Sequence, residues 1–140
     1  MVSFLKYIFE EMTRLFAGED VSIVWGTASE SISKTWKDLI VISAGQSTLT
    51  EEDTGDFPIE DKTVRIQCFA KSMRKAVLLG DKIFKHFYRT GSTLADGRVI
   101  SATRDSEDTV LDPDRTAEGE EIWQNIQDLI FKVQRSIKEN

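Results

Sequence analysis

A chain of 140 residues, of which 40% are hydrophobic, is long enough for one core, so a single domain covering residues 1–140 is predicted. One cysteine excludes an internal disulfide, and one histidine leaves no His/Cys cluster for zinc or iron, so no metal or other cofactor is expected. The net charge of −6 is concentrated: Ala44 to Asp61 holds six acidic residues without lysine or arginine, and Asp105 to Glu121 holds eight against one arginine.

These two acidic segments are set in a chain that is otherwise neutral to basic, so the molecule is expected to be segregated in charge. Charged residues also interrupt every apolar stretch well before the roughly 18 residues that a membrane span needs. The first residues lack the basic region of a signal peptide. We therefore expect no membrane contact, and the lone cysteine favours a reducing compartment.

The first part of the chain has its apolar residues at helical spacing. Apolar residues recur at three- and four-residue steps from Phe4 to Phe16, Ser3 can cap the start, and Gly18 can end the last turn. This pattern predicts an amphipathic helix of about 14 residues. The alternation from Val21 to Trp25 then predicts a short strand.

A buried strand and a long acidic connection come next. The segment from Trp36 to Ser43 contains the run Leu39-Ile40-Val41-Ile42, which is typical of a strand buried on both faces. After Gly45 the acidic segment has neither helical nor strand periodicity, and a long loop of this kind is more often functional than accidental. Val64 to Ala70 alternates as a strand with Cys68 facing the core, so the acidic loop is expected to form a projecting hairpin.

A second helix with two different faces is predicted from Met73 to Tyr88. Ser72 can cap its start, and Gly91 stands where a left-handed residue would end it. One side is apolar and is expected to face the core. The other side is basic, and we interpret it as solvated or as facing an acidic protein segment. Its basic residues are Arg74, Lys75, Lys82, Lys85 and Arg89.

Strands are predicted for the remainder of the chain. Asp96-Gly97 is a good turn, and Arg98 to Arg104 and Thr109 to Leu111 are predicted as separate weak strands. Residues 122–137 fit both a helical and an alternating period, and their β preference favours a final strand. The predicted fold is α+β: a single mostly antiparallel sheet, two main helices packed on one face, and a long acidic hairpin or loop.

Two sequence patterns are compatible with chemistry, but simpler roles explain them. Ser72-x-x-Lys75 and Ser31-x-x-Lys34 have the spacing of a serine–lysine hydrolase, yet the companion motifs are absent and a helix cap explains Ser72 better. The carboxylates from Asp105 to Glu118 could ligate calcium, but no glycine occupies the sixth position of such a loop. His86 is expected to be a surface or boundary residue. We therefore predict that the protein is not an enzyme.

The chain runs from an N-terminal helix through the strand Asp38 to Ile42, an acidic loop, the strand Val64 to Ala70, the helix Met73 to Tyr88 and the Val99 strand to a closing segment, Asp128 to Val133. This order resembles that of the tail terminator, or tail completion, proteins of long-tailed bacteriophages and of related minor tail and neck proteins. The resemblance spans nearly the whole chain and is architectural.

The resemblance implies a structural virion protein of the tail or neck that is assembled in the host cytoplasm. Such a protein forms a homo-oligomeric ring, usually of six subunits, and can be a monomer in solution before it meets the tail. The ring caps the tail tube and joins it to the head connector. The tail tube protein and the head connector protein are then the expected partners.

The acidic segments are the candidate partner-binding sites. A ring places different surfaces of neighbouring subunits in contact, and opposite charges there set orientation and encounter rate. Negative charge at a lumen would also keep passing DNA from binding, and a pI near 4.9 disfavours sequence-specific DNA recognition. The candidate residues are Glu51, Glu52, Asp53, Asp56, Asp112, Asp114 and Glu118.

Two further functions stay open on the sequence alone. The chain also fits a cytosolic protein-binding adaptor or regulatory module, which a defined one-to-one complex would favour. A hydrolase that uses Ser72 and Lys75 is less compatible, and a serine-reactive probe that labels Ser72 alone would support it.

Overall fold

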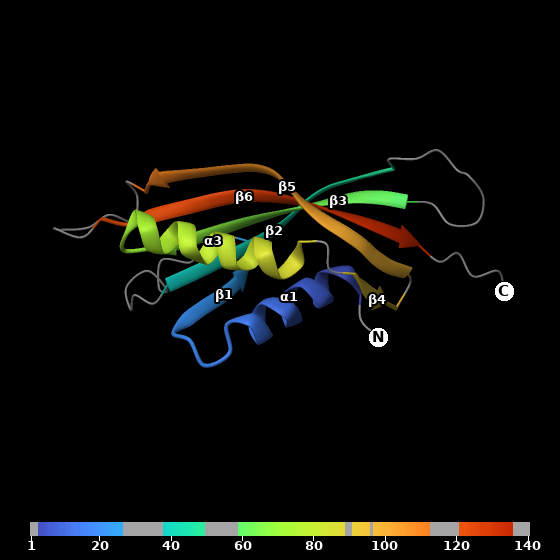
Figure 1. Cartoon of the computed structure of the whole chain (residues 1–140), viewed down its shortest axis with the longest axis horizontal. Helices are drawn as coiled ribbons and strands as arrows, with labels where there is room; N and C mark the ends of the chain where they lie inside the picture. The colour runs from blue at the N-terminus through green and yellow to red at the C-terminus, as the bar shows by residue number, and fades with distance from the viewer. Residues whose placement is uncertain are drawn as a thin grey trace.

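The computed structural model describes residues 3–26, 38–49, 59–88, 91–95, 97–112 and 121–135. Within these ranges it contains two helices and six strands: α1 (Phe4–Leu15), β1 (Val21–Trp25), β2 (Asp38–Leu49), β3 (Ile59–Ala70), α3 (Met73–Phe87), β4 (Ser92–Leu94), β5 (Gly97–Leu111) and β6 (Trp123–Arg135). The strands form one sheet in the order β1-β2-β3-β6-β5-β4; β1 pairs with β2 in parallel, and the other neighbours are antiparallel. The predicted α+β class and mostly antiparallel sheet are confirmed (Figure 1).

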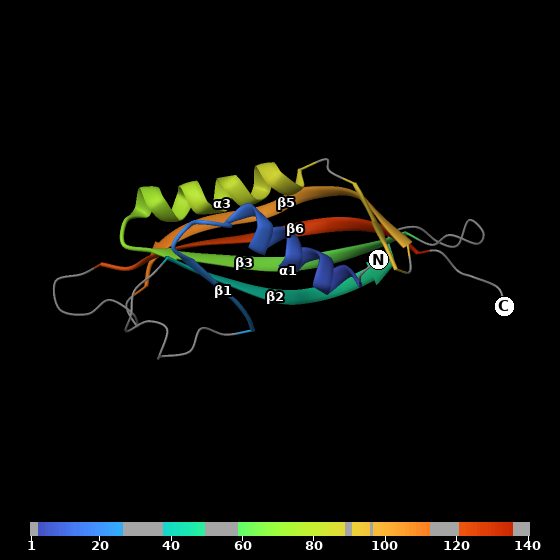
Figure 2. The ribbon, with the colours of Figure 1, turned by 90° about the horizontal axis from the view of Figure 1, so that it is seen from below.

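Both helices lie on the same face of the sheet, as Figure 1 and Figure 2 show. α3 packs over β3, β6 and β5, and α1 lies beside it. Each helix begins at a serine whose hydroxyl accepts a hydrogen bond from a backbone N–H three residues on. Ser3 accepts from Lys6 at 3.5 Å, and Ser72 accepts from Lys75 at 3.1 Å. Both predicted helix starts are therefore confirmed.

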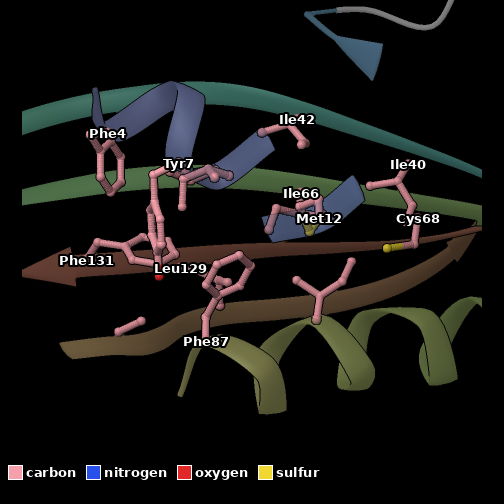
Figure 3. Packing of buried hydrophobic residues seen from close by; sticks show 14 of the residues in the cluster. Phe4, Tyr7, Met12, Ile40, Ile42, Ile66, Cys68, Phe87, Leu129 and Phe131 are labelled. Carbon is pink, nitrogen blue, oxygen red and sulfur yellow. The ribbon is translucent and has the colours of Figure 1, made fainter. Parts of the chain in front are cut away.

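The core fills the space between the sheet and the two helices (Figure 3). The ring of Phe131 in β6 meets Phe4 of α1 edge-on at a centroid distance of 5.3 Å and Phe87 of α3 at 5.4 Å. Edge-to-face pairs of this kind add stabilisation beyond the buried area. Cys68 of β3 points into the same core and is fully buried, as predicted. One aromatic side chain of the last strand thus holds both helices.

β2 is buried on both faces over its first half, as its β-branched run predicted. Ile40 and Ile42 point toward the helices and join the main core. Leu39 and Val41 point to the opposite face, where they form a smaller cluster with Phe69 and other apolar side chains. Alternate side chains of a strand face opposite ways, so a continuous apolar run requires cover on both sides.

The connection between β2 and β3 is shorter than predicted. β2 continues to Leu49 and β3 already begins at Ile59, so both strands extend into the segment that was expected to be a loop. Leu49 pairs with Glu60 in the antiparallel ladder, which agrees with the predicted hairpin. These extensions lack apolar alternation and are held by backbone pairing, which leaves no local sequence signal. The acidic loop itself lies outside the described residues.

The C-terminal half of the chain corrects two further predictions. β5 is one strand from Gly97 to Leu111 instead of two short ones, and it contains irregularities at Ile100 and Asp105 that interrupt its alternation. Gly91 does not end α3 in a left-handed conformation, because the helix already ends at Phe87 and the next residue turns into extended backbone. The predicted final strand is confirmed as β6, which forms the centre of the sheet's antiparallel part.

Candidate interaction surface

The structure describes one of the seven candidate partner-binding residues. Asp112 follows β5, is 3% exposed, and donates its backbone N–H to the carbonyl of Ile122 at 2.7 Å. Its carboxylate is therefore enclosed by this chain and does not lie on the surface. The other six, Glu51, Glu52, Asp53, Asp56, Asp114 and Glu118, lie outside the described residues. Their role stays a prediction.

Half of the second acidic segment is a sheet edge. β4 pairs with β5 from Gly97 to Val99, and along the rest of β5 no described strand lies on that side. Asp105, Glu107 and Asp108 are exposed on this part of the strand, and we call them the acidic edge. Charged residues and bulges on an edge strand prevent unspecific pairing with other chains. The acidic edge is thus a charged surface along a part of β5 with no described neighbouring strand.

Part of the first acidic segment is neutralised within the chain. Glu60 lies 3.4 Å from the ammonium of Lys62 and 3.1 Å from the guanidinium of Arg135. Asp61 lies 3.8 Å from the ammonium of Lys132. Both carboxylates therefore face cations of β3 and β6.

The acidic edge is tied to the core through Arg104, whose side chain makes four contacts. Its Nε donates to Oε1 of Gln127 at 3.0 Å, and one Nη donates to Oδ1 of Asp81 on α3 at 3.1 Å. The other Nη lies 3.4 Å from Oε2 of Glu107, and the guanidinium stacks over Phe84 at 4.4 Å from the ring centroid. One arginine of β5 therefore fixes α3 to the sheet and orients Glu107.

A polar pair of β6 completes this network under α3. Asn125 and Gln127 are polar, yet both are fully buried on the apolar face of β6. Gln127 donates to the carbonyl of Gly80 at 2.8 Å, and Asn125 donates to Glu107 and to Thr109 at 3.0 Å each. Buried amides are stabilising when their hydrogen bonds are made. The acidic edge is therefore preorganised by the core.

Gly80 allows α3 to approach this polar pair. A Cβ at that position would lie 2.1 Å from Oδ1 and 2.8 Å from Cγ of Asn125. Oδ1 of Asn125 is buried and has no hydrogen-bond partner in the described part of the chain. Helix and sheet thus touch at a glycine, where any larger side chain would push them apart.

Sequence reasoning missed Arg104, Asn125 and Gln127. A signal was present, because the alternation of β6 puts Asn125 and Gln127 on the same face as Leu129 and Phe131. Two neutral polar residues in a row of core positions indicate a buried hydrogen-bond network. The identity of their partners depends on how α3 lies over the sheet, which the sequence alone does not give.

Two of the basic residues predicted for this side of α3, Lys75 and Lys82, form ion pairs in the described part of the chain. The ammonium of Lys75 lies 3.8 Å from the Asp38 carboxylate of β2, and Lys82 pairs with Glu19. His86, half-buried as expected, lies 3.2 Å from Glu11 of α1. Lys75 and Lys82 therefore face acidic residues of the N-terminal third, while Arg74 and Lys85 are exposed, so each of the two interpretations holds for part of this side.

The pKa of Asp38 is raised by this arrangement. Burial of its carboxyl is the largest cause, and it outweighs the opposing effect of Lys75. The nearby carboxylates of Asp20 and Glu19 raise the pKa further.

Ser72 and Lys75 do not form a catalytic pair. The Ser72 hydroxyl accepts from the backbone N–H of Lys75, while the ammonium of that lysine is directed to Asp38. A general base must be neutral and within reach of the hydroxyl proton. The motif is therefore a helix cap followed by a paired lysine.

The sheet face opposite the helices carries a second ordered pair. Arg65 of β3 donates two hydrogen bonds to Asp128 of β6, from Nε at 2.9 Å and from Nη2 at 3.2 Å. Ser106 of β5 also donates to Asp128, at 3.3 Å. The hydrogen bond from Arg65 is the largest cause that holds the pKa of Asp128 below its usual range.

A pocket of about 280 Å³ lies at the start of α1. Its walls include Phe4, Leu94 and Val133 together with the cations Lys62 and Arg135. Both cations contact the carboxylate of Glu60, which compensates part of their positive charge. Among the described residues no group of three or more His, Cys, Asp or Glu side chains is placed to hold a metal ion. In the same residues, neither helix is long and apolar enough to cross a membrane.

No protein-family model matches this sequence, and no curated protein matches it. Among solved structures, the chain is similar to a chain of the structure described as "Virion of native gene transfer agent (GTA) particle". The two share 9% sequence identity with a TM-score of 0.56, and the match covers 91% of each chain. At this identity the likeness shows that both chains have the same fold.

Proposed function

We propose that the protein is a structural component of a phage-like virion, where it binds other subunits and does no chemistry. The fold likeness to a chain of the gene transfer agent particle supports this proposal, because it covers nearly the whole of both chains. The observation that carries it in this chain is the acidic edge, a group of three exposed acidic residues on an open part of a strand. A charged edge of this kind suits recognition of a partner with complementary charge.

The finer proposal is that the subunits form a ring in the tail or neck, of six copies, that caps the tail tube and joins it to the head connector. Head-to-tail contacts close such a ring, and each contact brings two different surfaces together. The acidic edge would supply one of these surfaces. Arg74 and Lys85, which are exposed on α3, are basic residues of the kind that its partner surface requires.

The acidic residues outside the described part have a separate proposed role. Glu51, Glu52, Asp53 and Asp56 would meet a neighbouring subunit or line the lumen of the ring. Negative charge at a lumen keeps DNA from binding while it passes. Reversing these four charges and imaging the tails tests this role, and unchanged assembly together with unchanged DNA passage counts against it.

The acidic edge gives the sharper experiment. The double variant Asp105→Lys/Asp108→Lys reverses two exposed charges that do not belong to the Arg104 network. The control Glu10→Lys reverses an exposed charge on α1. Glu10 forms an exposed ion pair with Lys6, with a separation of 3.9 Å between the charged atoms. Particles assembled with each variant are counted by negative-stain microscopy as joined or as separate heads and tails.

We expect the double variant to leave heads and tails unjoined while its folding, measured by circular dichroism, is unchanged. The control is expected to assemble as the unaltered chain does. Normal joining with the double variant would contradict the role of the acidic edge. If deletion of the whole chain also left the particles complete, the virion role itself would be wrong.

A further inference from the structure

The two edges of the sheet are built differently. On one side, β5 has no described neighbour beyond the residues that pair with β4, and there it carries the acidic residues and two irregularities that discourage pairing. β1, at the other edge, consists of Val21, Ser22, Ile23, Val24 and Trp25, without a charge, a proline or an irregularity in its pairing with β2. No described strand lies on its outer side, and Figure 2 shows β1 at the margin of the sheet. An unprotected edge is a template for another strand.

The surroundings of β1 are apolar. Trp25 is 40% exposed and stacks on Phe9 of α1 at a centroid distance of 5.8 Å and an interplanar angle of 19°. A groove of about 350 Å³ runs between α1 and β1, and its walls include Phe9, Phe16, Val21 and Ile23. An exposed tryptophan beside half-buried apolar groups along an open strand is typical of a site of protein contact.

The hydrogen-bonding groups of β1 alternate in direction. The N–H of Gly26 donates to the carbonyl of Ile42 in β2 at 2.9 Å, so every second residue before it also points its backbone groups to β2. The backbone groups of Val21, Ile23 and Trp25 therefore point outward. The N–H of Val21 already donates to the carbonyl of Glu19 at 3.0 Å. The outward donors that need a partner are those of Ile23 and Trp25.

We propose that β1 pairs with β1 of a second copy of this chain, antiparallel and centred on Ile23. In this register the N–H of Ile23 in each copy donates to the carbonyl of Ile23 in the other. The N–H of Trp25 donates to the carbonyl of Val21, so both outward donors of each copy are satisfied. Trp25 of one copy then lies beside Val21 of the other, an aromatic and β-branched pair that stabilises antiparallel sheets.

Local charge repulsion does not oppose a second copy in this register. The pairing places Asp20 opposite Gly26 and leaves the two Asp20 carboxylates at opposite ends of the contact. No like charges face each other across the two strands. The result is one continuous sheet through both molecules, with the two Trp25–Phe9 stacks beside the joint.

This contact is distinct from the proposed ring. A two-fold contact uses the same surface in both copies and closes on itself, whereas a ring joins two different surfaces. The β1 pairing therefore describes the free protein, and it protects an edge that would otherwise attract other strands. It can be tested without any virion component, so its failure and that of the proposed function are distinguishable.

Sedimentation velocity of the purified full chain over a range of concentrations tests the pairing. Trp25→Lys places a charge on the bare edge, and Ile23→Pro removes the central outward donor without touching a bond to β2. The matched control Val110→Lys places the same charge on an exposed residue of β5. We expect dimers for the unaltered chain and the control, and for the two β1 variants a dimer dissociation constant raised at least about tenfold.

A cross-link provides a readout that does not depend on loss of binding. Ile23→Cys places two thiols side by side at the two-fold axis, and Cys68 is buried and out of reach of the reagent. A short bismaleimide is expected to link Ile23→Cys into dimers and to leave the control Val110→Cys monomeric. A monomeric unaltered chain at every concentration would overturn the proposal. So would a dimer that persists in both β1 variants and fails to cross-link through position 23.

Discussion

Replacing Arg104 with alanine removes one of the contacts that hold α3 on the sheet. The side chain is 20% exposed, and it hydrogen-bonds Gln127 and Asp81 while it stacks on Phe84. Arg104→Ala leaves Oε1 of the fully buried Gln127 without its donor, which costs about 1–3 kcal/mol. Loss of the cation–π contact adds about 0.5–1 kcal/mol. Asp81 and Glu107 are partly exposed and can be hydrated again, so they add little.

The expected loss of unfolding free energy is therefore about 1.5–4 kcal/mol. Urea unfolding followed by tryptophan fluorescence measures it as a shift in midpoint at constant slope. Arg65→Ala is the matched control, because Arg65 also makes two side-chain hydrogen bonds, in its case both to Asp128, but its side chain is 55% exposed. An exposed pair of this kind contributes about 0–1 kcal/mol.

Comparing the losses of unfolding free energy in the two alanine variants tests whether the buried network stabilises the fold more than the exposed pair does. If Arg104→Ala costs no more than Arg65→Ala, then Gln127 finds another donor or water, and the reasoning is wrong. Arg104→Lys keeps the charge but not the planar fork, so it is expected to recover only part of the loss.

Three further outcomes follow from single contacts. Gly80→Ala is expected to destabilise the fold by about 1–3 kcal/mol in urea unfolding, because its Cβ would meet Asn125 at 2.1 Å; stabilisation, as alanine normally gives inside a helix, would contradict the close approach. Because Arg65 lowers the pKa of Asp128, the pair stabilises the fold above the ordinary carboxyl pKa, and this contribution disappears as the pH falls through the lowered value. The unfolding free energies of Arg65→Ala and of the unaltered chain should therefore differ at neutral pH and converge in acid. A difference that persists in acid would contradict a stabilising contribution from the ionised Asp128. Burial raises the pKa of the Cys68 thiol, so Ellman's reagent should modify it at the rate of unfolding, and faster modification would show an open path to the core.

Elements whose signal is local were predictable from the sequence. The serine caps and the apolar spacing gave both helices, and the alternation before Val133 favoured the strand that β6 forms. The strand extensions of β2 and β3 were not predictable, because their pairing partners lie far away in the sequence. The single long β5 was missed for a related reason. Its two bulges break the alternation that marks a strand.

The candidate surface was predicted only in part. Charge counting located the acidic segment after Asp105, but not that its first half is a strand at an open edge. Asp112 was taken as a partner-binding residue, while the structure encloses it beside Ile122. Whether a carboxylate is exposed depends on the packing around it, and spacing along the chain does not contain that information.

The most direct test of the proposed function is the content of purified particles. Quantitative mass spectrometry with isotope-labelled peptides of this chain measures how many copies each particle retains after washing in high salt. A structural subunit of the tail or neck should be present at a fixed, small number of copies per particle, six for the proposed ring. Absence from washed particles, or an amount that varies freely between preparations, would contradict the proposal that the protein is part of the virion.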